Sequence, residues 1–108
     1  MRCSSISFAF LSFVTLAACG GPPTAPAVPV TPDVVARARA QWPDATEASL
    51  AHGHDTFAAR CHKCHELPDV NAQSPKDWPG TLDDMAGRAG LTPGEKTDVL
   101  HYLLAAHR

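Results

Sequence analysis

The run Cys61-His62-Lys63-Cys64-His65 decides how this chain is expected to fold. Its two cysteines stand three positions apart, and a histidine follows the second directly. At the end of a helix, two thiols with this spacing can reach the two vinyl groups of one porphyrin and form a thioether with each. His65 then lies under the iron and donates a ring nitrogen as an axial ligand. The spacing therefore predicts one covalently bound haem c on Cys61 and Cys64.

Three other uses of a Cys-x-x-Cys pair compete with haem attachment. A structural zinc site normally needs four protein ligands, and of the other two cysteines, Cys3 is expected to be removed with a signal peptide and Cys19 to carry a lipid. A thioredoxin-type redox pair needs a βαβ context, and no strand pattern of alternating residues appears in the sequence. A disulfide between the two cysteines is possible in an oxidising compartment, but it leaves His65 without a role. These comparisons favour haem.

The iron of such a haem takes a second axial ligand or leaves that position open. Met85 is the only methionine after Met1, and it shares a predicted helix face with Leu82 and Ala89. A methionine on an apolar face usually packs in a core, but here that core would contain the haem. We therefore predict that Met85 is the second ligand. The competing ligands are His101, which is the best placed of them, His54, His52 and His107.

Residues 1–18 have the pattern of a bacterial lipoprotein signal peptide, with a short positive start and an apolar stretch. That stretch, residues 6–16, is shorter than the roughly 20 residues that a membrane-spanning helix needs. It ends in Leu16-Ala17-Ala18-Cys19, which resembles a lipobox, so Cys19 is the predicted lipidation site. The alternative is an ordinary signal peptide with an incidental cysteine. Gly20 stands where an aspartate would retain the lipoprotein at the inner membrane, which favours the outer membrane, facing the periplasm.

The rest of the chain divides into a tether and one domain. Five prolines follow Gly20, so residues 19–32 are expected to form an extended, lipid-anchored tether. Residues 33–108 then form the domain, since a chain of 108 residues allows only one. The net charge of -2 offers no basic face for a nucleic acid. Aromatic residues make up 6% of the chain, and a large apolar cofactor would complete so small a core.

The domain is predicted to be all-α, with three to four short helices wrapped around one covalent haem. Helical patterns cover residues 33–42, a stretch from Asp44 or Thr46 to Cys61, and residues 77–89 and 92–106. The expected N-terminal caps are Asp33, Asp44 with Glu47, Asp77, and Thr92 with Glu95. Gly90 is expected to end the third helix.

Gly53 interrupts the apolar stripe of the second predicted helix. Glycine costs roughly 1 kcal/mol in a helix interior relative to alanine. A missing Cβ lets another backbone approach closely. The sequence therefore predicts that a second helix contacts this one at Gly53.

A series of residues around the Cys-x-x-Cys-His run gives the chain a family resemblance. The series is Gly53 and Phe57 before the run, then Leu67-Pro68, Trp78-Pro79, Met85, Leu91-Thr92 and Tyr102-Leu103. From about Leu50 to Leu104 the chain resembles a small single-haem class I cytochrome c.

The resemblance implies that the first and last helices of that family's fold cross beside the haem. Gly53 and Phe57 lie on one of them, and Tyr102 or Leu103 on the other. It also implies that the carbonyl of Pro68 accepts a hydrogen bond from His65, which would fix the orientation of the imidazole ring. The interval from His65 to Met85 is shorter than in larger members of the family, so Met85 can approach from within a helix rather than from a loop.

The expected function is electron transfer without enzymatic activity. Methionine and histidine ligation fills both axial positions of the iron and raises its reduction potential relative to two histidines. The protein is expected to be a monomer that meets a redox partner transiently at the periplasmic membrane surface. Two alternatives remain open: a haem-based sensor or binder of small ligands, and an accessory electron-transfer subunit of a membrane or periplasmic oxidoreductase.

Overall fold

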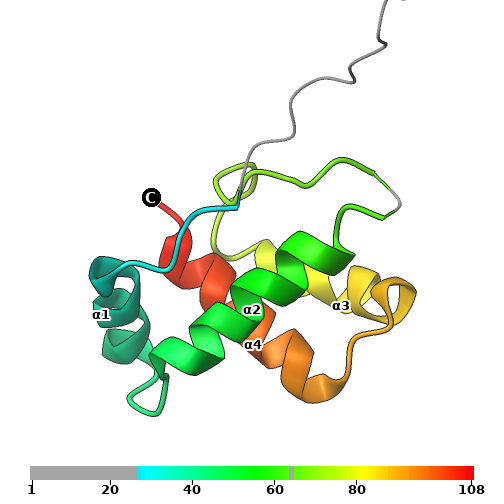
Figure 1. Ribbon diagram of the computed structural model, residues 1–108. Coiled ribbons are helices and arrows are strands. Elements are labelled where there is room, and N and C mark those ends of the chain that lie inside the picture. Colours follow the sequence, from blue (N-terminus) through cyan, green and yellow to red (C-terminus); the bar gives the residue numbers. More distant parts are fainter. Residues whose placement is uncertain (1–26, 64) are drawn as a thin grey trace, which may run out of the picture.

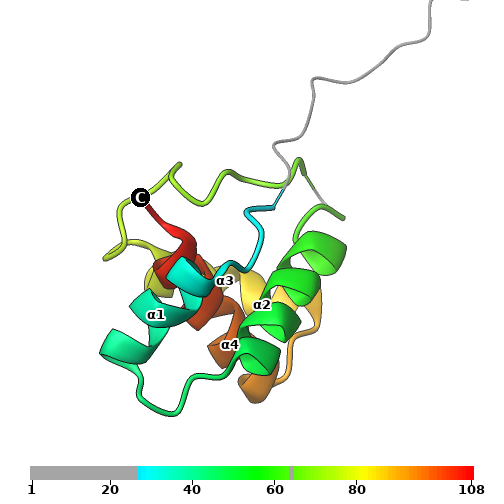
Figure 2. The same cartoon turned by 60° about the vertical axis from the view of Figure 1, so that its left-hand side comes forward.

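The computed structural model describes residues 27–63 and 65–108, and within these ranges it is entirely helical, with no strand. The predicted signal peptide, most of the predicted tether, Cys19 and Cys64 lie outside the described residues. The helices are α1 (Pro32–Gln41), α2 (Glu47–Arg60), α3 (Trp78–Ala89) and α4 (Pro93–Ala106). Figures 1 and 2 show α2 crossing α4, with α1 and α3 packed on different sides of α4. The all-α prediction is confirmed.

The caps of the first two helices stand two residues away from the predicted caps Asp33 and Asp44. Thr31 caps α1, since its hydroxyl accepts a hydrogen bond from the Val34 amide, whereas the predicted cap Asp33 lies inside the first turn. Thr46 and Ser49 form the capping box of α2 in place of Asp44 and Glu47. The physical reason is register, because a cap must stand immediately before the first helical residue for its oxygen to reach the third amide. Asp33 and Asp44 do not stand there.

The other helix ends test three further predictions. Asp77 precedes α3 but makes no capping hydrogen bond, because its backbone is already helical and its carboxylate accepts from the Ser74 hydroxyl at 2.5 Å. Thr92 and Glu95 form the predicted capping box of α4. Gly90 ends α3 in the left-handed conformation, with φ +68°. The predictions for Gly90 and Thr92 are confirmed, and Asp77 stands at the predicted cap position but does not cap the helix with its side chain.

The contact predicted at Gly53 is the crossing point of α2 and α4. A Cβ placed on Gly53 would lie 2.1 Å from the carbonyl oxygen of Asp98 and 3.0 Å from Cβ of Tyr102. The backbone of α4 therefore occupies the space that a side chain would need. The crossing fixes where the C-terminal end of α2 emerges beside α3.

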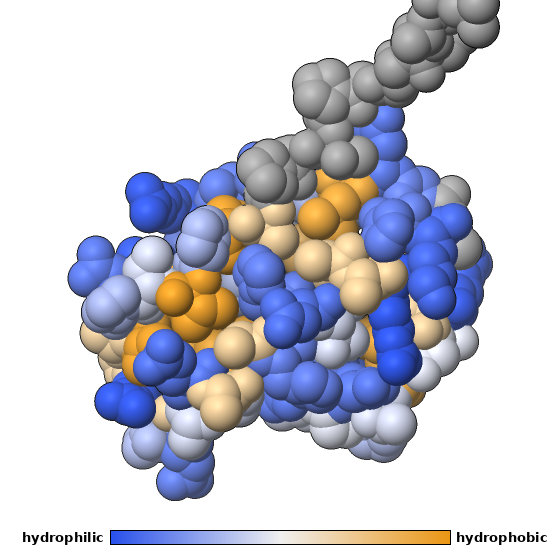
Figure 3. Space-filling model, in the orientation of Figure 1, coloured by the Kyte–Doolittle hydropathy of each residue, from blue (hydrophilic) through white to orange (hydrophobic). Residues whose placement is uncertain are grey.

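Two apolar clusters hold the helices together. The first joins α2, α3, α4 and the loop before α3, and its buried members are Phe57, Val70, Trp78, Leu82, Val99, Tyr102, Leu103 and Ala106. The second holds α1 against α4 and the first turn of α2, and it consists of Val34, Ala38, Ala45, Leu50 and Ala105. Hydrophilic side chains cover most of the face seen in Figure 3, and apolar groups show between them.

The end of the predicted tether packs against the domain. Val28 and Val30 contact the first cluster, and the Tyr102 hydroxyl donates a 2.8 Å hydrogen bond to the carbonyl of Val28. Burial raises the pKa of Tyr102 to about 12, so this hydroxyl stays protonated as a donor. The packed part of the chain therefore begins before residue 33. Trp42 lies on the domain as expected, where its ring stacks on His101 at 3.9 Å.

Candidate functional site

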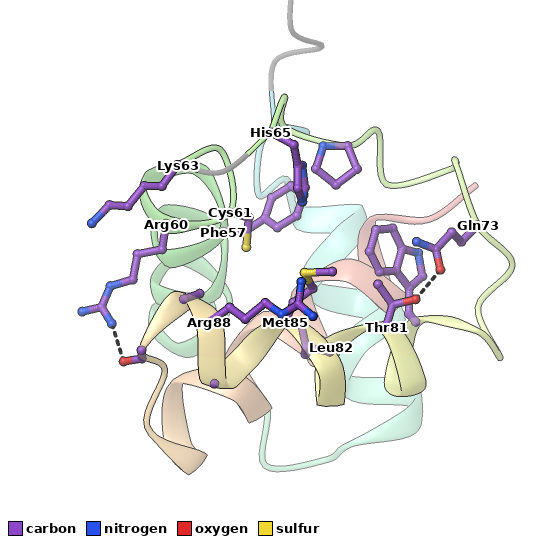
Figure 4. Close-up of a pocket in the computed structure, with 15 residues that line it drawn as sticks. Phe57, Arg60, Cys61, Lys63, His65, Gln73, Thr81, Leu82, Met85 and Arg88 are labelled. Carbon is purple, nitrogen blue, oxygen red and sulfur yellow. Dashed lines mark hydrogen bonds between the residues drawn. The ribbon is translucent and has the colours of Figure 1, made fainter.

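A cavity of about 540 Å³ lies between the C-terminal end of α2, the loop that follows it, and α3. Phe57, Pro68, Trp78 and Leu82 form much of its apolar wall, and polar side chains stand at its edges (Figure 4). A cavity of this size falls in the range of roughly 300–1,000 Å³ that small molecules and cofactors occupy in proteins.

Three of the four predicted haem-site residues line this one cavity. Cys61 comes from the end of α2, His65 from the following loop and Met85 from the middle of α3. Figure 4 shows the sulfur atoms of Cys61 and Met85 pointing into the cavity, with the His65 ring on the opposite side from Met85. The fourth residue, Cys64, lies outside the described residues. The cavity thus collects one nitrogen and two sulfur donors from three segments.

The His65 ring is oriented by a backbone carbonyl. Nδ1 of His65 donates a 2.7 Å hydrogen bond to the carbonyl oxygen of Glu66, and not to that of Pro68 as the resemblance implied. A carbonyl can only accept, so Nδ1 carries the proton and a neutral ring keeps its lone pair on Nε2. This tautomer suits metal binding through Nε2. The carbonyl of Glu66, the residue next to His65, therefore takes the place predicted for that of Pro68.

Cys61 and Met85 are both half-buried, and a helix positions each of them. The amide of Cys61 closes α2 by donating to the carbonyl of Phe57 at 3.1 Å, which leaves the thiol beside the cavity. Burial raises the pKa of this thiol, so Cys61 does not have the acidic thiol of a redox-catalytic cysteine. Met85 lies one turn after the buried Leu82 and approaches the cavity from within a helix.

The four histidines that competed with Met85 do not line the cavity. His52 and His54 bind the carboxylates of Asp98 and Asp55, each at 2.8 Å. The other two are His101, stacked on Trp42, and His107, whose Nε2 donates to the carbonyl of Gln73 at 3.1 Å. Within the described ranges, no group of three or more His, Cys, Asp or Glu side chains is arranged to hold a metal ion.

The cavity also has residues that the sequence analysis did not single out, among them Gln73, Thr81 and Arg88. Thr81 and Arg88 stand four positions before and three positions after Met85, so helical spacing could have placed them on its face. Gln73 lies in the irregular loop and carries no such signal. Its position depends on tertiary contacts, which include the bond from His107.

Comparisons of the chain with protein-family models, with curated proteins and with solved structures give no match. Across residues 27–63 and 65–108, none of the four helices combines the length and the apolar character needed to cross a membrane.

Proposed function

We propose that this chain is a small class I cytochrome c, an electron carrier with one covalent haem. One observation carries the proposal: Cys61, His65 and Met85, predicted from sequence as haem-site residues, line a single cavity although they come from three segments. A thiol at a helix end, an imidazole with a free Nε2 and a thioether form a donor set that suits a c-type haem.

Each residue has a defined task in this proposal. Cys61 and Cys64 would hold the haem through thioethers, and His65 Nε2 and the Met85 sulfur would ligate its iron. When bound, the haem supplies a one-electron iron couple whose potential is raised by methionine ligation. The hydrogen bond from His65 to Glu66 fixes the imidazole ring.

Two features favour electron transfer over catalysis: both proposed iron ligands come from the protein, and the inner wall of the cavity is apolar. With His65 and Met85 both as ligands, the iron would have no coordination position left for a substrate. Phe57, Trp78 and Leu82 are buried and keep water from the inner wall of the cavity. Exposed residues such as Lys63 and Gly90 lie at its rim, where a redox partner can approach. Such encounters bury little surface and are short-lived, which suits a monomeric carrier.

The proposal includes the location of the carrier. Residues 1–18 direct export to the periplasm, and lipidated Cys19 anchors the protein to a bacterial membrane, with the outer membrane favoured by Gly20. Confinement near a surface raises the effective concentration of the carrier around membrane-bound partners.

The proposal is tested by expressing the full chain in a host with haem-attachment machinery and recording its mass and its absorption spectrum. We expect one haem per chain and an oxidised spectrum with sulfur ligation. His65→Ala should lose the normal axial ligation, whereas His62→Ala should keep it, because His62 lies outside the cavity and binds the Ala58 carbonyl. Purified protein at the mass of the bare polypeptide would refute the proposal.

The role of Met85 is tested separately, because a carrier and a ligand-binding sensor differ at this position. Met85→Ala should lower the reduction potential and let the reduced protein bind carbon monoxide, which the unmodified protein should not do. Gly80→Ala is a matched control in the same helix, since a Cβ there meets no atom within 4 Å. An unchanged spectrum in Met85→Ala would eliminate this ligand, and carbon monoxide binding by the unmodified protein would favour the sensor.

A further inference from the structure

The residues directly before α1 form a docked segment, which we call the strap and define as residues 27–31. The strap has neither helix nor strand structure, yet Ala27, Val28 and Val30 are partly buried against the first apolar cluster. Val30 also contacts the second cluster, so it links the two. Pro29 is exposed and points away from both. The strap is therefore part of the packed domain, although the proline pattern assigned it to the tether.

Hydrogen bonds fix the strap near both of its ends. The hydroxyl of Tyr102, a fully buried residue of α4, donates to the carbonyl of Val28 at 2.8 Å. At the other end, the Thr31 hydroxyl accepts from the Val34 amide and caps α1. Pro29 stands between these contacts and limits the freedom of the undocked chain, which lowers the entropy that docking costs. A segment restrained at two points so close together keeps one path across the domain.

The strap meets the domain beside the loop that follows α2. Figures 1 and 2 both show the chain before α1 passing next to this loop. Leu67 and Val70 of the loop belong to the same apolar cluster that the strap contacts. The same loop contributes His65 and Pro68 to the cavity wall. The chain therefore enters the domain on the loop side of the cavity.

Docking of the strap limits the reach of the predicted tether. Residues 19–26 remain outside the strap, and a chain of eight residues spans at most about 29 Å. Without docking, residues 19–31 would all be free to extend, and they span at most about 47 Å. A chain that passes half-way around a domain about 30 Å wide covers about 47 Å. The short form therefore cannot bring the opposite face of the domain to the attachment surface, whereas the long form can.

We propose that the strap orients the domain on the membrane, with the loop side of the cavity facing the lipid surface. The inference rests on the proposed function, because it takes Cys19 as the lipid anchor and the cavity as the haem site. A carrier held in this way keeps the loop edge of its cavity within about 29 Å of the membrane. The partner that fits is a redox protein bound to the same membrane, whose docking site lies close to the lipid surface. A partner free in solution would meet mainly the opposite face, away from the cavity.

The test uses the haem-loaded, lipidated chain in vesicles of phosphatidylethanolamine and phosphatidylglycerol. A dye on the lipid headgroups transfers energy to the haem, and the efficiency of transfer falls steeply with the distance between them. Val28→Asp places a charge against the apolar cluster and should release the strap. The efficiency should then fall about as far as it does when a flexible insertion after residue 26 lengthens the tether by the five residues of the strap. Tyr102→Phe removes only the hydrogen bond and should produce a smaller fall.

Pro29→Asp is the matched control, because it places the same charge one position further along the strap, on an exposed residue. Its transfer efficiency should equal that of the parent protein.

Limited proteolysis of the full chain, followed by mass measurement, tests docking without a membrane. The parent should be trimmed no further than Ala27, and Val28→Asp as far as Pro32. If both proteins are trimmed to the same residue, or if both give the same energy transfer, the strap does not orient the domain, while the electron carrier stands. A parent protein that does not bind the vesicles overturns the lipid anchor, and one without haem overturns the carrier; the orientation falls with either.

Discussion

Replacement of Gly53 by alanine should test the helix crossing that places the whole site. The new Cβ would stand 2.1 Å from the carbonyl oxygen and 2.6 Å from the carbonyl carbon of Asp98, both of them backbone atoms of α4. No rotamer change can relieve such a clash. The two helices must separate by more than an ångström to restore ordinary contact, which loosens the packing of the fully buried Val99 and Tyr102.

The magnitude follows from two opposing terms. Overpacking a core costs about 1–3 kcal/mol and occasionally more, and a backbone clash belongs at the upper end of that range. Alanine gains about 1 kcal/mol over glycine in a helix interior. We therefore expect Gly53→Ala to lower the free energy of unfolding by about 2 kcal/mol. For a domain of this size, the midpoint of thermal unfolding should fall by roughly 8–16 °C.

The assay is urea and thermal unfolding followed by circular dichroism, with the variant and the parent protein carrying the same cofactor. Gly80→Ala in α3 is the control, because its Cβ would meet no atom within 4 Å. That variant should be as stable as the parent or more stable by up to about 1 kcal/mol. If Gly53→Ala is also as stable as the parent, the close approach of α4 does not depend on the missing side chain, and the reasoning is wrong.

Three further changes have defined outcomes. Trp78→Phe leaves the buried carbonyl of Val70 without its 3.0 Å donor and should cost about 1–3 kcal/mol in urea unfolding; equal stability would contradict that role. Burial lowers the pKa of His101 below its ordinary value of 6.5, although the charge of Asp98 acts to raise it. As the pH falls, the unfolded chain therefore binds a proton at His101 before the folded chain does. Stability should therefore decrease as the pH drops from about 6.5 through the folded pKa. His101→Phe keeps a ring against Trp42 and should remove this part of the pH dependence. If urea unfolding gives the variant and the parent the same dependence of stability on pH, His101 is not the group responsible. Cys19→Ser should release the protein from the membrane fraction into the soluble periplasm, and unchanged membrane association would exclude a lipid anchor.

The helices were predictable because proline, glycine and hydroxyl side chains mark their ends. Thr92 with Glu95 and the left-handed Gly90 act as the sequence indicated. The wrong caps, at Asp33 and Asp44, arose where several residues able to cap a helix stand close together. Their side-chain chemistry is nearly equivalent, and the choice among them depends on the exact first residue of the helix, which tertiary packing sets.

Prolines in the predicted tether gave only local information. They disfavour helix and sheet within the stretch, and the structure has neither over residues 27–31, but Pro32 takes the first position of α1, where a proline is tolerated. They do not decide whether extended backbone is free or packed. Val28 and Val30 pack because the face of Tyr102 lies beside them, and that contact joins residues 74 positions apart. No pattern within a short window of sequence can report it.

The sequence predicted the sulfur and nitrogen donors of the candidate site but not the other residues that line its cavity. Cys61, His65 and Met85 are each marked by type and spacing, and they line one cavity. The loop after His65 has no periodic pattern, so the position of Gln73 follows instead from side-chain bonds to distant residues. Arg88 shows a different limit of sequence analysis. An exposed arginine on a helix is usually a solvated charge, and only the structure shows that this one lines a cavity.

The two apolar clusters divide the molecule into a part that supports the fold and a part that forms the site. The second cluster joins α1 to α4 without contributing a residue to the cavity. The first cluster shares Phe57, Trp78 and Leu82 with the cavity wall. A ligand bound through Cys61, His65 and Met85 would connect α2, the loop and α3, which are the segments that this cluster already brings together. Ligand binding and packing of the first cluster therefore stabilise the same arrangement, while the contact of α1 with α4 holds independently of it.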